Sequence, residues 1–226
     1  MAASCVSDKF ELAARLLAEV VRTPKFPESE LAILRQQILL GLMVEAKTPE
    51  YVAEREFRQR LFGRHPYART STGEPQDVRA VRAEDLQRWW SGLVRPDACV
   101  LFIAGDVRKE PALAAARKYL GDWKAGGESP ASRVEAIPAP GATRIHLVDR
   151  PGSVQSQIRV GSASIARGDP DYYQADVLTQ IFGGSFNSRL NKAVRVEKGL
   201  TYGARGGLRA DRFAGRFQAS TFTKTS

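Results

Sequence analysis

With 226 residues, of which 43% are apolar and 26% charged, the chain has the composition of a folded globular protein and not of a disordered segment. No apolar run approaches the roughly 18–20 residues that cross a bilayer, so we expect no membrane span. The net charge of +9 favours acidic partners, but the basic residues are mixed with acidic ones and form no nucleic-acid-binding motif, so we expect no nucleic-acid partner.

The first half of the chain is predicted to be mainly helical. Apolar residues recur there at the spacing of one helix face, and Gly63 is a suitable residue for ending a helix. The apolar run ACVLFIAG (98–105) is instead continuous and bounded by turn residues, which predicts a buried strand. The expected helices cover residues 8–22, 28–46, 49–62, 83–93 and 110–123.

A change of composition divides the chain. Residues 124–142 are rich in Gly, Pro, Ala and Ser and show no sustained period, so we interpret them as a linker. The parts on either side are 1–123 and 143–226. Two helices are expected in the second part, over 169–184 and from about 188 to 198, between strands at 143–151, 156–165, 200–210 and 213–223. Helices and mixed strands together predict an α+β fold.

Two longer stretches carry a family resemblance. HPYARTSTGEPQDVRAVRAEDLQRWW (65–90) and RGDPDYYQADVLTQIFGGSFNSRLNKAVRVEKGLTYGA (167–204) resemble, in order, segments of the insulinase/pitrilysin family of zinc peptidases, in its processing-peptidase-like bacterial branch. The resemblance implies parts of two related α/β-roll domains, each a mixed or antiparallel sheet packed by helices. A full family member is about twice this length, so we expect a piece of a longer protein: the end of a first domain, the linker and the start of a second.

The resemblance also implies a zinc motif that this chain lacks. The family's H-x-x-E-H helix places two imidazoles on one face for Zn²⁺, and the glutamate activates a bound water. The only histidines here, His65 and His146, lie far apart and outside any such motif. In RQQILLGLMVE (35–45), Gly41 stands where the third ligand is implied, and Glu45 is a less favoured substitute. We therefore expect no metal ligand and no catalytic residue, with zinc held by a partner subunit.

One further match concerns substrate binding. RVEKGLTY (195–202) fits the family pattern R-x-x-x-G-L-x-Y, whose arginine and tyrosine help to hold the substrate, which implies that role for Arg195 and Tyr202. Both side chains can hydrogen-bond a peptide carbonyl, and Gly199 would let the chain turn back between them. The alternative is an ordinary strand tyrosine after a basic helix stripe. That stripe consists of Arg189, Lys192, Arg195 and Lys198.

The resemblance therefore implies a zinc-less subunit, inactive alone, that holds a peptide or protein substrate through Arg195 and Tyr202. A zinc-bearing homologous subunit would cleave that substrate in a heterodimer. One alternative is a fragment of a self-sufficient zinc metalloendopeptidase, with its motif upstream of residue 1. Another is a structural scaffold subunit without a peptidase role. The sequence leaves the substrate and the compartment, periplasmic or cytoplasmic, open.

Overall fold

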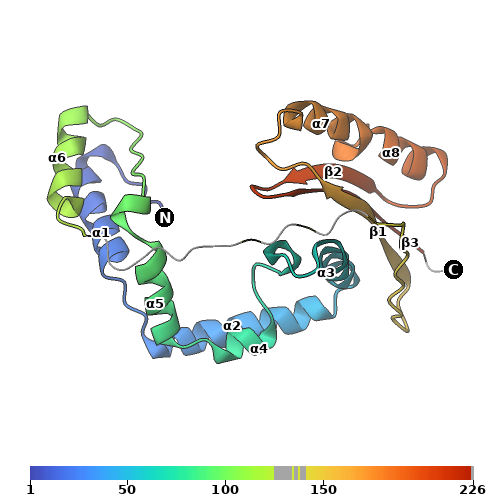
Figure 1. The fold of residues 1–226 in the computed structure, drawn as a ribbon, viewed down its shortest axis with the longest axis horizontal. Helices are drawn as coiled ribbons and strands as arrows, with labels where there is room; N and C mark the ends of the chain where they lie inside the picture. Colours follow the sequence, from blue (N-terminus) through green and yellow to red (C-terminus); the bar gives the residue numbers. More distant parts are fainter. Residues whose placement is uncertain (125–133, 135–136, 138–140, 225–226) are drawn as a thin grey trace. The chain divides into compact units, whose positions relative to one another are not determined.

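Figure 1 presents a computed structural model of the protein, which describes residues 1–124, 134, 137 and 141–224. The chain forms two compact units: Met1–Gln37 with Gln76–Ser132, and Ile38–Pro75 with Arg133–Ser226. The main helices are α1 (Phe10–Arg22), α2 (Glu28–Ala46), α3 (Pro49–Phe62), α4 (Pro75–Ala80), α5 (Ala83–Leu93), α6 (Lys109–Leu120), α7 (Tyr172–Thr179) and α8 (Arg189–Asn191). The 3₁₀ segments are η1 (Ser7–Lys9), η2 (Pro66–Ala68) and η3 (Pro96–Ala98), and the π-helical segments are η4 (Gln180–Gly184) and η5 (Lys192–Glu197). The strands are β1 (Gln155–Ser164), β2 (Ala204–Ala210) and β3 (Gly215–Lys224).

The first unit is helical and is held together by small apolar residues and a few directed polar contacts. Helix α1 packs against α6, and the buried residues Ala18 and Ala115 are small enough to let the two backbones approach. Arg22, at the end of α1, donates to the carbonyl of Tyr119 at 2.7 Å and pairs with Asp122 at 2.8 Å. These contacts satisfy groups at the C-terminal end of α6, where unpaired carbonyls accumulate.

The second unit contains an antiparallel sheet in the order β1-β3-β2. The side chains of Phe182 and Phe217 meet on one face, with ring centroids 5.6 Å apart, whereas Glu54 of α3 bonds Arg216 and Gln218 on the other. Since successive strand residues point to opposite faces, α3 lies across the sheet from η4. Figure 1 shows the same arrangement, with α7 and α8 on one side of the strands and α3 on the other. The fold is α+β, as predicted.

Glycine residues allow η4 to pack closely against β2 on one face of the sheet. A Cβ atom built on Gly183 of η4 would lie 2.3 Å from the backbone nitrogen of Gly206 in β2, closer than any real contact. Two backbones therefore touch directly at this point. Gly199 follows η5 with a φ of +62°, and its N–H donates to the carbonyl of Arg195 at 3.1 Å. The predicted reversal at Gly199 is thus confirmed.

Two apolar segments do not form the strands that their sequences predict. Residues 98–105 and 143–151 contain no strand, and Phe102 and Leu147 are 87% and 93% exposed. The prediction of a buried strand at 98–105 is therefore wrong. Apolar residues favour burial, but a strand also needs a neighbour for its backbone N–H and C=O groups, and the described residues of the first unit form no other strand.

The predicted division into 1–123, a linker at 124–142 and 143–226 stays a prediction. Most of residues 124–142 lie outside the part of the chain that the structure describes. The second compact unit also takes in residues 38–75, so part of the helical half packs with the sheet.

Candidate functional site

The two predicted substrate-binding residues lie on either side of the Gly199 reversal. Arg195 belongs to η5 and is half-buried, with its guanidinium 4.6 Å from the centroid of the Phe186 ring. Tyr202 lies just before β2 and is 79% exposed. A cation over an aromatic face is favourable, so the stacking on Phe186 restricts the arginine, whereas Tyr202 presents its phenol to solvent.

The side chains of Arg195 and Tyr202 are not hydrogen-bonded to each other. In the part of the chain that it describes, no hydrogen bond links Arg195 to Tyr202, and the Tyr202 hydroxyl has no hydrogen-bond partner. The guanidinium donates and the phenol both donates and accepts, so each remains chemically suited to a peptide carbonyl. Their convergence on one substrate group stays a prediction.

Asn191 fixes the segment that carries both residues. Its side chain is buried, and its Nδ2 donates to the carbonyl of Phe186 at 2.7 Å while its Oδ1 accepts from the N–H of Ala204 at 3.1 Å. One amide therefore ties the loop before α8 to the first residue of β2. Thr221 of β3 adds a bond to the carbonyl of Gly203 at 3.1 Å. The role of Asn191 is not predictable from the sequence, because a polar residue within a helical pattern gives no sign of which loop it reaches.

A polar cluster lies between α3 and the sheet, where Glu54 of α3 contacts two arginines. Its carboxylate accepts from Arg216 at 2.6 Å and from the Gln218 amide at 2.8 Å, and Arg159 lies 3.6 Å away. Burial raises the pKa of Glu54, but the hydrogen bond from Gln218 and the charges of Arg216 and Arg159 outweigh it and hold this pKa below the ordinary value. This cluster connects α3 to β1 and β3.

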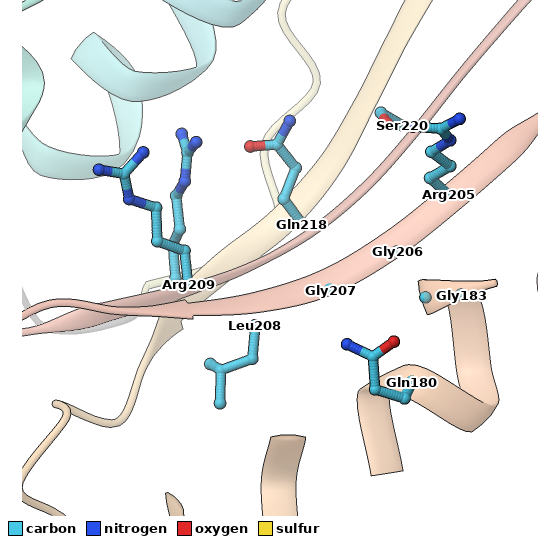
Figure 2. A pocket seen from close by; sticks show the side chains of 11 residues that line it. Gln180, Gly183, Arg205, Gly206, Gly207, Leu208, Arg209, Gln218 and Ser220 are labelled. Atoms are coloured by element: carbon cyan, nitrogen blue, oxygen red, sulfur yellow. The ribbon is translucent and has the colours of Figure 1, made fainter. Parts of the chain in front are cut away.

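A pocket of about 320 Å³ opens beside β2. Figure 2 shows Arg205, Gln218 and Ser220 on one side of the strand and Leu208 and Gln180 on the other, so the pocket follows the strand edge. The pocket is lined by Gln180, Gly183, Gly184, Arg205, Gly206, Gly207, Leu208, Arg209, Arg216, Gln218 and Ser220.

The described residues do not fit a zinc ion. His65 is buried, its Nδ1 accepts from the N–H of Tyr67 at 3.1 Å, and it begins a short 3₁₀ turn, so it has a structural partner. His146 is exposed in a segment with neither helix nor strand. Gly41 lies in α2 without a side chain, and Glu45 belongs to no group of three or more possible ligands among the residues that the structure describes. In that same part of the chain, no helix is both long and apolar enough to cross a membrane.

Comparison with known proteins places the chain in a family. Residues 80–225 match the model of the peptidase M16 inactive domain. An uncharacterised zinc protease of Mycobacterium tuberculosis is 29% identical over 192 residues, and the non-peptidase homolog YmxG of Helicobacter pylori is 22% identical over 187 residues. These matches cover 84% and 82% of this chain but 44% and 42% of the relatives, so the chain spans less than half the length of either.

Solved structures agree with the sequence comparison. A crystal structure of a peptidase M16 inactive domain from Pseudomonas fluorescens is 31% identical, with a TM-score of 0.86 over 97% of this chain and 52% of that one. A protease from Helicobacter pylori has a TM-score of 0.87 over 96% of this chain and 53% of that one, at 18% identity, which is evidence for the fold alone. The predicted resemblance is confirmed: the chain belongs to the peptidase M16 family and contains its inactive domain.

Proposed function

We propose that this chain is the zinc-less, substrate-holding member of a two-subunit peptidase, in which Arg195 and Tyr202 bind the backbone of a peptide or protein substrate. A homologous zinc-bearing subunit would cleave that substrate. The observation that carries the proposal is the Tyr202 phenol, which is exposed and unbonded in the described part of the chain, next to a reversal that Asn191 fixes.

Two further observations support a role without metal. Gly41 stands on α2 at the position where the family resemblance implies a zinc ligand, and glycine has no group that can coordinate. Two relatives are also named as proteins without peptidase activity. They are the non-peptidase homolog YmxG of Helicobacter pylori and the probable inactive metalloprotease YmfF of Bacillus subtilis, and the second is 25% identical over 195 residues.

The proposal is tested by reconstitution. The full-length protein is purified from its native host, an associated subunit with an H-x-x-E-H motif is identified by mass spectrometry, and the pair is assayed on peptides. Tyr202→Phe and Arg195→Ala are each expected to lower kcat/KM by at least about tenfold, because a donor to the substrate carbonyl is lost. Arg189→Ala is the matched control, since Arg189 is an exposed arginine of the same basic stripe. Unchanged activity in both site variants would refute the assigned roles.

A self-sufficient zinc peptidase is the second candidate, because several relatives, including the mycobacterial protein, are named zinc proteases. It requires an H-x-x-E-H motif in the same polypeptide, upstream of residue 1. Sequencing that region and assaying the purified protein alone, with and without a chelator, separates the two candidates. A scaffold subunit would give no peptide affinity even in the assembled complex.

The proposal includes a domain assignment. Residues 1–123 would close a first family domain and residues 143–226 would open a second, with 124–142 between them. Limited proteolysis of the full-length protein tests this division, which predicts cleavage within 124–142 ahead of cleavage in the flanking helices and strands.

A further inference from the structure

Arg195 contacts an aromatic ring instead of an acidic group. Among the described residues, no carboxylate lies within ion-pair distance of its guanidinium, which lies 4.6 Å from the centroid of the Phe186 ring. Glu197, two positions along the chain, is exposed and forms no ion pair in that part of the chain either. The stacking on Phe186 is therefore the described contact that orients this arginine.

Phe186 is an exposed aromatic residue on an anchored loop. It is 63% exposed, so its ring gains little from burial in the core. Its backbone is nevertheless fixed, because its carbonyl accepts from the buried side chain of Asn191 at 2.7 Å. The N–H of Ser188 also donates to the carbonyl of Ser185 at 3.2 Å, which closes the loop as a turn. The feature of this ring that the structure uses is its contact with the arginine.

Stacking on a ring and pairing with an acid leave an arginine with different free groups. A guanidinium is planar and directs its five N–H donors outward in that plane. A carboxylate in a bidentate pair occupies two of these donors, whereas an aromatic ring attracts the cation through its face and needs none of them. Arg195 is thus held by Phe186 while its N–H groups stay available for a carbonyl.

We propose that Phe186 is a positioning residue of the substrate-holding site, whose ring orients the Arg195 guanidinium without using the N–H groups that bind the substrate carbonyl. The inference rests on the proposed function, because Phe186 acts only through Arg195. Asn191 extends the arrangement to the second binding residue. Its amide anchors Phe186 on one side and Ala204, two positions after Tyr202, on the other.

Substitutions of Phe186 in the reconstituted two-subunit peptidase test this role. Phe186→Leu keeps an apolar side chain but removes the ring, and we expect kcat/KM to fall about fivefold, mainly through a higher KM, because the arginine is no longer oriented for substrate binding. Phe186→Tyr keeps the ring and should retain kcat/KM within about twofold. Phe186→Glu should cost at least about tenfold, because its carboxylate would pair with Arg195 and occupy the donors.

Phe213→Leu is the matched control. Phe213 is also an exposed phenylalanine beside an arginine, with the Arg212 guanidinium 5.4 Å from its ring centroid, but it lies in the hairpin between β2 and β3. This variant should change kcat/KM by less than about twofold, since it leaves Arg195 untouched. Circular dichroism melting confirms that each variant is folded.

Nuclear magnetic resonance of the full-length protein alone tests the stack without an activity assay. With isotope-labelled arginine, the Arg195 side-chain signal is identified by its absence in Arg195→Ala. Groups over an aromatic face experience its ring current, so this signal should move in Phe186→Leu and stay close to its original position in Phe186→Tyr.

The two measurements separate the possible failures. An Arg195 signal that does not move in Phe186→Leu would overturn the stack. Unchanged kcat/KM in Phe186→Leu, or equal losses in Phe186→Leu and Phe213→Leu, would overturn the positioning role. Unchanged activity in Arg195→Ala would instead refute the proposed function, and with it the role of Phe186, even where the signal moves.

Discussion

At the scale of single residues, Glu54 of α3 is a carboxylate shared by two arginines of the sheet. Arg159 and Arg216 are largely buried, and both place guanidinium nitrogens beside this one carboxylate. Removing one partner of a buried ion pair leaves the other charge without compensation, which costs more than the pair itself contributes. Glu54 is therefore a structural residue, and we expect its replacement to weaken the packing of α3 on the sheet.

Replacement of Glu54 by glutamine tests this view. Glu54→Gln keeps the shape but removes the charge, and we expect the free energy of unfolding to fall by about 1–3 kcal/mol. The measurement is urea denaturation followed by circular dichroism. Glu50→Gln is the control, because Glu50 is exposed at 3.6 Å from Arg159 and its loss should cost less than about 0.5 kcal/mol. Equal effects of the two variants would contradict the assigned role.

The same carboxylate should make stability depend on pH. Its pKa is lower in the folded state than the ordinary value of 4.5, so the unfolded chain binds this proton more readily. The contribution of Glu54 is therefore fully present above pH 4.5 and is lost as the pH falls through the lower folded pKa. Denaturation curves between about pH 6 and pH 3 should show this loss in the unmodified protein, and a smaller decline in Glu54→Gln. Parallel declines in the two proteins would exclude Glu54 as a source.

The sequence located some of these residues and not others. Arg195 and Tyr202 belong to one short motif that matches the family pattern, so the resemblance drew attention to them, whereas their spacing alone is equally typical of a basic helix face followed by a strand tyrosine. Glu54 and Arg216 are 162 positions apart, and Asn191 reaches Ala204 across a reversal. Contacts of this kind depend on which helix face meets which strand, and no local pattern specifies that.

At the scale of elements, the helices were more predictable than the strands. The limits of α2 and α3 agree with the sequence prediction. Local residues determine where a helix ends: Gly63 follows α3 with a φ of +55°, a conformation that glycine adopts readily. The apolar run at 98–105 was predicted as a strand on composition alone and lacks a pairing neighbour among the described residues. The π-helical form of η4 was not predicted either, because its sequence resembles that of an ordinary helix.

Two helical glycines should respond oppositely to the same substitution. Gly183→Ala would push a methyl group into the Gly206 backbone, and we expect a loss of about 1–3 kcal/mol in the free energy of unfolding. Gly41→Ala meets nothing within 4 Å and should gain up to about 1 kcal/mol, because alanine favours the helix. Urea denaturation of both variants provides the comparison. A gain in Gly183→Ala would show that η4 and β2 are not in such close contact.

At the scale of the whole molecule, the net charge and the exposed apolar residues have opposite effects on association between copies of the chain. A net charge of +9 keeps copies of the chain apart, whereas exposed apolar runs draw them together. Such runs occur in both compact units, around Phe102 in the first and Leu147 in the second. Since salt screens charge over about 10 Å at 0.1 M, the balance should shift toward association as the ionic strength rises.

This balance predicts how the 226-residue chain behaves when it is produced by itself. Light scattering should detect self-association that increases with salt, and Phe102→Ser and Leu147→Ser should each reduce it. Both side chains are almost fully exposed, so neither substitution should change the free energy of unfolding by more than about 0.5 kcal/mol. Leu42→Ser is the contrasting variant: Leu42 is buried, so the cost should be several kcal/mol, about 2–5, and association should worsen as the chain unfolds. A chain that stays monomeric at high salt would show that these apolar runs do not contact one another between copies.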